Sequence, residues 1–282
     1  MSIQPPSVLL MGPSGSGKTY SLSTLLEAGL EAFLFVTEPH GLESLLDVVA
    51  AKKLDLGKLH WRYISPTRPG FETQQRLAEL VSISNQGALA GMAPTSRSEA
   101  SFIQLMKSFN NFVDEKDGKS YGPVNVFGHN CAVVIDSLSG LSSMAMDVTI
   151  GDKVTASPGE WGIAMRLLDK FITTCTGDLK CFFIMTSHTE REEDQITGAS
   201  KIMVSTLGKK LAPSIPKYFS EVVLADTITE GDKRTHLWST NTANVVLKNR
   251  ALPISSKLEP SFKPIVEAFK ARLALVANSK VA

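Results

Sequence analysis

A segment near the N-terminus has the residue types and spacing that bind a nucleotide's phosphate chain. Residues 12–19 read GPSGSGKT and match the pattern G-x-x-x-x-G-K-[S/T] in full. Glycines let backbone N–H groups turn toward phosphate oxygens, and the following helix directs its positive end at the same oxygens. We expect Lys18 to contact the β- and γ-phosphates of ATP and Thr19 to bind Mg²⁺. The candidate nucleotide-binding residues are Gly12, Pro13, Ser14, Gly15, Ser16, Gly17, Lys18 and Thr19.

The neighbours of this motif decide between a phosphate-binding loop and a glycine-rich surface turn. The apolar residues 7–11 precede it and predict a buried strand, and residues 18–28 have the spacing of a helix. A strand, a glycine-rich turn and a helix in that order are the context in which the motif binds phosphate. We therefore favour the phosphate-binding loop.

A second candidate metal ligand ends an apolar segment in the middle of the chain. Residues 131–136 read CAVVID, which predicts a buried strand with Asp136 at the edge of a sheet. Mg²⁺ at a phosphate-binding loop takes a ligand of this kind, so we assign Asp136 to the metal together with Thr19. Alternatively, Asp136 caps the following helix, for which the next residues, Ser-Leu-Ser, are suitable.

Hydrolysis requires a carboxylate that orients the attacking water. Asp136 is followed by Ser137 rather than by glutamate. Glu38 comes just after the apolar run AFLFV at 32–36, and the end of a neighbouring strand is the other place from which a carboxylate can reach the γ-phosphate. We therefore take Glu38 as the candidate catalytic base. The alternative is that Glu38 caps the amphipathic helix predicted over 41–52.

The elements that must position these side chains follow from apolar periodicity. Short apolar runs predict strands at 7–11, 31–36, 60–64, 131–136 and 179–187. Helical spacing predicts helices at 18–28, 41–52, 71–84, 98–115 and 158–174, with Pro158 in the first turn of the last. Because strands alternate with helices and several strands are wholly apolar, we expect an α/β fold with a mostly parallel central sheet flanked by helices.

The C-terminal part departs from this alternation. Residues 221–225, 236–240 and 245–248 predict a strand meander, and residues 261–276 predict a terminal amphipathic helix. Polar, small and helix-breaking residues predict loops at about 84–98, 116–130 and 190–210. No long linker interrupts the chain, so we expect residues 1–282 to form a single domain.

Composition limits the classes of partner. The formal net charge is +1, so no global basic field favours nucleic acid, and any such contact must come from a local patch. Cys131, Cys175 and Cys181 lack metal-binding spacing, and because Cys131 and Cys181 each open an apolar run, we expect these two to be buried free thiols in a reducing cytosol. No apolar run reaches the roughly 18 residues of a membrane span, and the N-terminus lacks the pattern of a signal peptide. We expect a soluble cytoplasmic protein.

The order of these motifs resembles the RecA superfamily of ATPases. In that family the catalytic glutamate ends the strand after the phosphate-loop helix, as Glu38 does, and the metal-binding aspartate comes much later, as Asp136 does. A polar residue, often Gln, ends the next strand and senses the γ-phosphate. His188 occupies that position after Met-Thr-Ser. The resemblance implies a RecA-like P-loop fold with His188 as the sensor; the alternative is a polar residue that merely ends a strand.

The segment KNR at 248–250 resembles the Lys-x-Arg pair of hexameric helicases and related RecA-fold rings. There both cations reach the ATP of the neighbouring subunit. The resemblance implies the same role for Lys248 and Arg250 in a homo-oligomer, and Arg suits it because its planar fork pairs bidentately with phosphate. The alternative is a solvated basic turn.

Over nearly its whole length the chain resembles small phage-encoded, RecA-like ATPases of single-strand annealing and recombination. The resemblance implies an ATPase stimulated by single-stranded DNA, in the host cytoplasm, with a single-strand-binding protein as a further partner. Residues 146–160 and 191–210 correspond to the two DNA-lining loops, and the second contains Lys201, Lys209 and Lys210. A solvated charged loop explains these lysines equally well. Two other functions stay open: a nucleotide or small-molecule kinase, and a non-hydrolysing, nucleotide-switched assembly protein.

Overall fold

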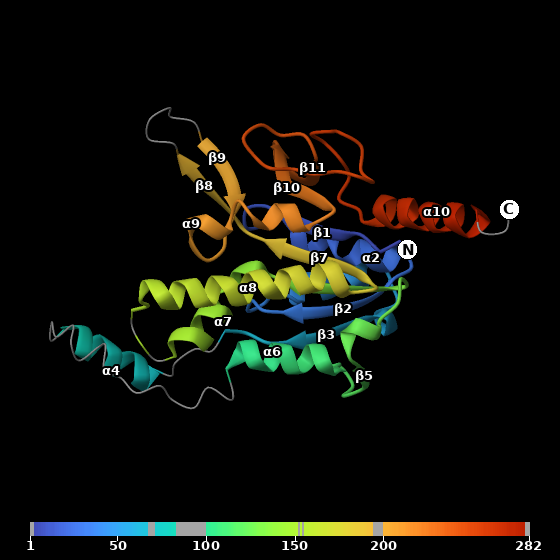
Figure 1. The fold of residues 1–282 in the computed structure, drawn as a ribbon. Coiled ribbons are helices and arrows are strands. Elements are labelled where there is room, and N and C mark those ends of the chain that lie inside the picture. The colour runs from blue at the N-terminus through green and yellow to red at the C-terminus, as the bar shows by residue number, and fades with distance from the viewer. Residues whose placement is uncertain are drawn as a thin grey trace.

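The computed structural model has a seven-stranded central sheet in the order β11-β10-β1-β7-β6-β2-β3 (Figure 1). It describes residues 3–66, 71–82, 100–151, 153, 155–193 and 200–279. All neighbouring strands of this sheet are parallel except β11, which is antiparallel to β10. The strands are β1 (Ser7–Met11), β2 (Glu31–Val36), β3 (Leu59–Tyr63), β6 (Cys131–Asp136), β7 (Phe182–Ser187), β10 (Glu221–Glu230) and β11 (Lys233–Ser239). The predicted mostly parallel α/β fold is confirmed.

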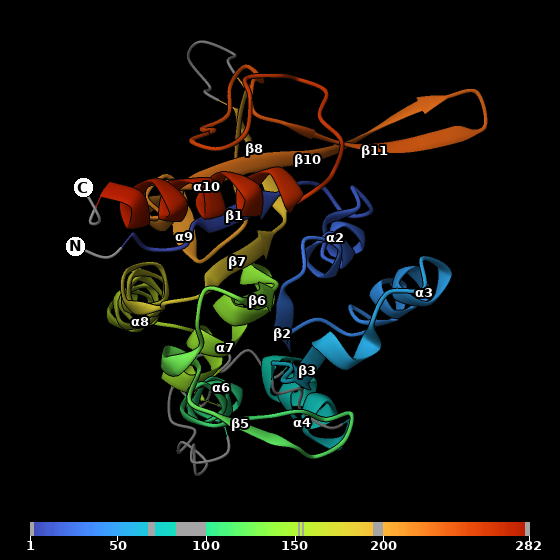
Figure 2. The ribbon, with the colours of Figure 1, turned by 90° about the vertical axis from the view of Figure 1, so that its right-hand side faces the viewer.

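Helices cover both faces of the sheet, because alternate strand residues are buried on opposite sides. Leu9 and Met11 of β1 face one apolar cluster, and Val8 and Leu10 face the other. Figure 2 shows α2 and α3 on one side of the sheet and α8 on the other. The helices are α1 (Lys18–Ser21), α2 (Ser23–Glu27), α3 (Glu43–Ala51), α4 (Phe71–Ser82), α6 (Ser101–Asn110), α7 (Leu138–Ile150), α8 (Pro158–Asp178), α9 (Gly208–Leu211) and α10 (Lys263–Ser279), with short 3-10 turns at Leu56–Lys58, Val124–Val126 and Ile215–Tyr218.

The long helix α8 begins where its local sequence predicts. Ser157 caps the helix by accepting from the Glu160 backbone N–H, and the Glu160 side chain accepts from the Ser157 backbone N–H. Pro158 is at the first turn, where its missing N–H costs no intrahelical hydrogen bond. The predicted start of this helix is confirmed.

Several boundary predictions were wrong. Residues 245–248 form only isolated bridges, through Val245 and Lys248, rather than a strand. The predicted loop at 116–130 contains β5 (Ser120–Gly122), which pairs with β4 (Phe112–Val113). The predicted loop at 190–210 contains β8 (Thr189–Glu193), β9 (Ser200–Val204) and α9. Both of these strand pairs lack a long apolar run, so their pairing left little signal in the sequence. The predicted loop at 84–98 lies outside the described residues.

Helix α7 was considered only as the helix that Asp136 would cap; Ser137 caps it instead, and α7 overlaps the first proposed DNA loop, residues 146–160. Its sequence, LSGLSSMAMDVTI, is rich in residues with modest helix propensity. Leu138, Leu141, Met144 and Ala145 are all fully buried. Tertiary burial of this face therefore outweighs the weak local preference.

Two further sequence expectations concern membranes and thiols. No helix in the described ranges has an apolar stretch long enough to cross a bilayer. Cys131 and Cys181 are free and buried, as predicted, and Cys175 is free and buried as well. Burial raises the pKa of Cys131 to about 11 and that of Cys181 to about 12, so both thiols are held protonated and unreactive.

Candidate nucleotide-binding site

The phosphate-binding loop joins β1 to α1 at the carboxyl end of the sheet, where parallel α/β folds place their ligands. Gly12 starts the loop, and its backbone N–H donates to the Ser187 carbonyl at the end of β7. A Cβ at Gly12 would lie only 2.2 Å from the Ala225 carbonyl oxygen of β10. The position therefore accepts only glycine. The first residue of the loop packs closely between β7 and β10, the two strands that flank β1.

Lys18 lies over this loop. Its side chain is buried, and Nζ donates to the Gly12 and Pro13 carbonyls, 2.9 Å away in each case. Burial lowers the Lys18 pKa, whereas the nearby Asp136 and Glu38 carboxylates raise it. The ammonium is thus held against the loop and close to two acidic groups.

Thr19 and Asp136 form the candidate metal pair. The Thr19 hydroxyl donates to Asp136 Oδ2 over 2.8 Å, and the Thr186 hydroxyl of β7 donates to Oδ1. Asp136 is 6% exposed, and burial raises its pKa, an effect that the Thr186 and Thr19 hydrogen bonds oppose. A cation beside this carboxylate would compensate its burial, because an adjacent positive charge favours the ionised form.

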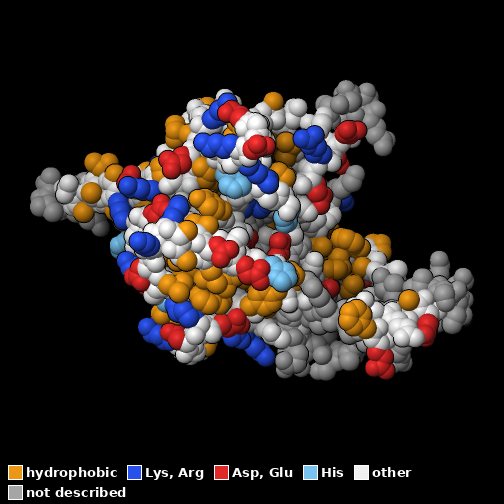
Figure 3. Space-filling view, turned by 180° about the vertical axis from the view of Figure 1, so that it is seen from behind, with side chains coloured by type: hydrophobic (Ala, Val, Ile, Leu, Met, Phe, Trp, Pro, Cys, Tyr) orange, Lys and Arg blue, Asp and Glu red, His pale blue; other side chains and the backbone are white. Residues whose placement is uncertain are grey.

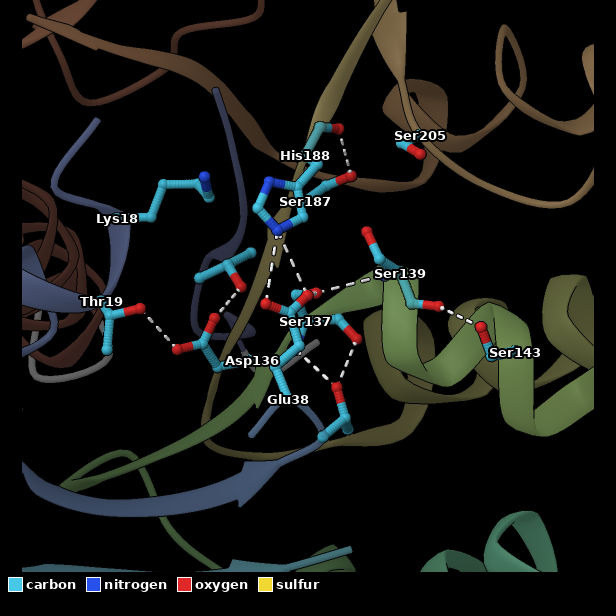
Figure 4. A network of polar contacts seen from close by, with 12 residues as sticks. Lys18, Thr19, Glu38, Asp136, Ser137, Ser139, Ser143, Ser187, His188 and Ser205 are labelled. Atoms are coloured by element: carbon cyan, nitrogen blue, oxygen red, sulfur yellow. Dashed lines mark hydrogen bonds and ion pairs between the residues drawn. The ribbon is translucent and has the colours of Figure 1, made fainter. Parts of the chain in front are cut away.

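Glu38 lies at the same edge, two residues after β2. Its carboxylate accepts from the Ser137 hydroxyl and lies 3.3 Å from His188 Nε2. Thr37 fixes the adjoining backbone, since its hydroxyl donates to the Ser137 carbonyl and accepts from the Ser137 N–H. Figure 4 shows Glu38 and His188 pointing toward each other beside Asp136 and Ser137. The contact with His188 is the largest cause of a lowered Glu38 pKa, so Glu38 is an ionised carboxylate at neutral pH.

The residues present fit a magnesium nucleotide. The Ser16 hydroxyl is buried within the loop and has no hydrogen-bond partner among the described residues, so a phosphate oxygen would satisfy it. Over the described ranges, no group of three or more His, Cys, Asp or Glu residues could hold a metal by itself. Mg²⁺ in nucleotide sites takes one or two protein ligands and completes its shell with phosphate oxygens and water. Thr19 and Asp136 are sufficient for that.

Lys248 and Arg250 lie away from their own chain's loop. Lys248 pairs with Val222 in the first part of β10, and its Nζ donates to the Phe219 carbonyl over 2.6 Å. Both cations line a cavity of about 220 Å³ together with residues 4–7, which lead into β1. The phosphate-binding loop follows the opposite end of β1. The structure does not bring these two residues together with Lys18 and Asp136 in one chain.

The predicted DNA-contacting lysines lie on or beside the β8–β9 hairpin. Lys201, on β9, is exposed and pairs across the hairpin with Glu192. Lys210, in α9, is also exposed. The side chain of Lys209 lies outside the described part of the structure. Their role in DNA binding stays a prediction.

Sequence reasoning missed four residues of this site. Thr186 and Ser137 flank positions that the motifs had already identified, in the segments MTSH and IDS. Their hydroxyl groups, next to the motif residues, were the feature of the sequence that could have identified them as hydrogen-bond partners in the site. Arg234 and His236 of β11 also reach the phosphate-binding loop. No motif marks these two, because their placement depends on the pairing of β11 with β10.

Comparison with known proteins identifies the family to which the sequence is similar. A family model described as an AAA domain matches residues 4–251, which include the phosphate-binding loop, Glu38, Asp136 and His188 and extend just beyond Arg250. No curated protein matches the chain.

Proposed function

We propose, given that the chain belongs to the AAA domain family and is therefore a P-loop nucleotide-binding protein, that it binds ATP with Mg²⁺ and hydrolyses it. One observation supports this most strongly. Lys18, Asp136 and Glu38 come from separate parts of the chain and meet at the carboxyl end of the sheet. A cation for phosphate, a carboxylate for the metal and a second, ionised carboxylate are the groups that hydrolysis of a phosphoanhydride requires.

Each residue has a separate task in this mechanism. Lys18 and the loop N–H groups hold the phosphates. Thr19 and Asp136 would hold Mg²⁺, which would neutralise charge that develops on the phosphate oxygens. Glu38 accepts a proton as the water oxygen bonds to the γ-phosphorus and the bond to ADP breaks. Ser137 and His188 orient the Glu38 carboxylate.

The RecA-like assignment is part of this proposal. It is supported by Glu38 at the end of the strand that follows the phosphate-loop helix, and by His188 directly after β7. β7 lies between β1 and the strand that ends in Asp136, so His188 leaves the sheet beside both ATP-binding segments. A contact between His188 and the γ-phosphate would therefore also affect the Glu38 carboxylate, which His188 contacts.

The oligomeric part of the proposal concerns Lys248 and Arg250. Because they lie away from their own phosphate-binding loop, they would act on the nucleotide of a neighbouring copy. Buried Glu221 accepts from the backbone N–H groups of Arg250 and Ala251, and Arg272 donates to the Arg250 carbonyl. These contacts fix the backbone from which the Arg250 side chain extends. Lys248 Nζ donates hydrogen bonds to the carbonyls of Lys217 and Phe219.

The β8–β9 hairpin is the proposed contact for single-stranded DNA. It begins directly after His188, and the Ser205 N–H donates to the His188 carbonyl. A nucleotide-dependent shift of His188 would thus move both ends of the hairpin. Figure 3 shows positive and negative side chains interspersed over the face seen there. We therefore expect weak binding by one subunit and cooperative binding by several along one strand.

A salt titration of a labelled oligonucleotide tests the DNA proposal. Binding should be stronger with ATP than with ADP, with a logarithmic salt slope of about −0.7 per phosphate neutralised. Changing Lys201, Lys209 and Lys210 together to Ala should flatten the slope and leave ATP affinity intact. The matched control changes three exposed lysines on other elements to Ala: Lys58, Lys107 and Lys263. Undetectable binding at low salt by folded, ATP-bound protein would reject the DNA proposal.

ATP turnover measured with and without single-stranded DNA tests the central proposal. Turnover that rises with DNA supports the full assignment. Tight ATP binding without turnover would instead indicate a nucleotide-switched assembly protein, an alternative that follows from Ser137 in place of a glutamate after Asp136. Phosphate transfer to a small acceptor would indicate a kinase.

A further inference from the structure

A second cation reaches the phosphate-binding loop from the other side of β1. Arg234 is on β11, and its Nη2 donates to the Gly15 carbonyl over 2.8 Å. A Cβ at Gly15 would be 3.1 Å from the same nitrogen. Gly15 has a φ of +73°, so the guanidinium lies against a part of the loop that is open because it has no side chain.

His236, two residues further along the same face of β11, fixes this arrangement. A Cβ at Gly17 would be 2.6 Å from His236 Cγ, so the imidazole packs directly on the loop backbone. Its ring centroid is also 5.6 Å from that of Tyr20, which follows Thr19. Successive residues on one strand face are spaced by two positions, and Arg234 and His236 contact loop positions that are also two apart. The β10–β11 hairpin is thus seated on the loop in a defined register.

Within the described residues, no protein carboxylate neutralises the charge of Arg234. Its side chain is exposed, and no carboxylate in the described part of the chain lies within ion-pair distance of it. Burial and the neighbouring Arg234 charge lower the pKa of His236, so the imidazole is neutral at neutral pH. The hairpin therefore brings one fixed positive charge to the loop.

A guanidinium in this position suits a phosphate chain. The N–H groups of a phosphate-binding loop face the anion while its carbonyls face away, so Arg234, on the Gly15 carbonyl, starts from the outer side of the loop and would turn around its edge to meet a phosphate oxygen. Rotation about the torsions of its long side chain moves the guanidinium by several ångströms without moving the hairpin. The guanidinium has five N–H donors, and one contact to Gly15 leaves others for phosphate oxygens.

We propose that Arg234 is a phosphate-contacting residue of the nucleotide site, supplied within the same chain by the β10–β11 hairpin. It holds the phosphate chain from the side of β1 opposite to Asp136 and Glu38. This rests on nucleotide binding by the loop and not on hydrolysis, so a protein that binds ATP without turnover still tests it.

The test measures ATP and ADP affinity by calorimetry in wild type, Arg234→Gln, Arg234→Lys and Lys233→Gln. Lys233 is the neighbouring exposed cation on the opposite face of the strand, so it is the matched control. Loss of a charge-assisted hydrogen bond should weaken binding about tenfold or more in Arg234→Gln. Arg234→Lys should retain part of the affinity, because it keeps the charge, and Lys233→Gln should bind like wild type.

Two further readouts separate a phosphate contact from a structural clamp on the loop. Affinity in Arg234→Gln should depend less steeply on salt than in wild type, because one charge contact with the nucleotide is gone. Thermal unfolding of the nucleotide-free variants should match wild type. Affinities within twofold of wild type in Arg234→Gln would overturn the proposal. So would equal losses in Arg234→Lys and Arg234→Gln with an unchanged salt dependence, since that result describes a clamp.

Discussion

The imidazole of His188 lies 3.3 Å from the carboxylate of Glu38, although the two residues are 150 positions apart in the chain. His188 follows β7 and Glu38 follows β2, and the strand that ends in Asp136 lies between them. The contact links the proposed γ-phosphate sensor to the proposed base. A change at His188 should therefore alter the ionisation of Glu38 as well as any contact with nucleotide.

Replacing Glu38 by Gln should keep ATP binding and slow hydrolysis by about 10²- to 10⁴-fold, because the amide cannot accept the proton from water. Steady-state turnover and calorimetric ATP affinity check this. Glu43→Gln is the control, since Glu43 is an exposed acid in the first turn of α3. Wild-type turnover in Glu38→Gln would place the base at another residue.

His188→Ala should move the acid limb of the turnover profile to higher pH. The contact with His188 is the largest cause of the lowered Glu38 pKa, so its removal lets Glu38 protonate nearer its ordinary value of 4.5. His188→Gln retains a side-chain donor, so its acid limb should fall between the two. A pH profile of the turnover number, measured at saturating ATP, is the test. Coincident acid limbs in all three proteins would show that His188 does not control Glu38.

The same lowered pKa predicts a pH dependence of stability. Because folding lowers the Glu38 pKa, its stabilising contribution is present above the unfolded pKa and is lost as the pH falls through the folded pKa. Glu38→Gln should therefore flatten the acid decline of the unfolding free energy below about pH 4.5. Urea unfolding at several pH values measures this decline. A decline as steep as that of wild type would show that folding does not lower the Glu38 pKa.

Asp136→Asn should impair Mg²⁺-dependent turnover more than nucleotide binding. Thr19 and Thr186 donate to different oxygens of Asp136, so the amide keeps an acceptor for only one of them, and it loses the charge that favours the metal. Turnover across a Mg²⁺ titration should require higher Mg²⁺ and reach a lower plateau. Lys18→Ala is the contrasting variant, in which ATP binding itself should be lost. Superimposable Mg²⁺ titrations for Asp136→Asn and wild type would remove Asp136 from the metal site.

Mixing two inactive chains tests whether Arg250 acts across an interface. Arg250→Ala lacks the proposed finger and Lys18→Ala lacks the nucleotide site, so each should be inactive alone. In a mixed oligomer some interfaces unite an intact loop with an intact finger, and part of the turnover should return. Co-assembly must be shown by differential tags. Co-assembly without recovered turnover would place Arg250 outside the site.

Gly140→Ala should destabilise the protein even though alanine favours helices. A Cβ at Gly140 in α7 would lie 2.3 Å from Thr37 Oγ1, which also holds Ser137 beside Glu38. Overpacking of this kind costs about 1–3 kcal/mol. Gly162→Ala in α8 is the control: its Cβ would meet nothing within 4 Å, so a gain of about 0.5–1 kcal/mol is expected. Urea unfolding measures both, and a stabilised Gly140→Ala protein would disprove the close packing.

The phosphate-binding loop, the strand ending in Asp136 and the α/β class were predictable from sequence, because each depends on local order. A glycine-rich turn between an apolar strand and a helix fits few structures, and wholly apolar runs indicate strands covered on both faces. The placement of Glu38 at the edge of the sheet was predictable from its position after such a run. These signals are short in range, so one sequence was enough.

The tertiary structure decided which side chains meet. Helix α7 forms through burial against the sheet rather than through its own propensity, and it carries Gly140 to Thr37. The placement of Arg234 and His236 depends on strand pairing in the β10–β11 hairpin, where a shift of one residue would turn both side chains away from the loop. Lys248 and Arg250 look like site residues in sequence, yet strand direction puts them away from the loop. Long-range pairing and close packing made these choices, and neither is encoded in local spacing.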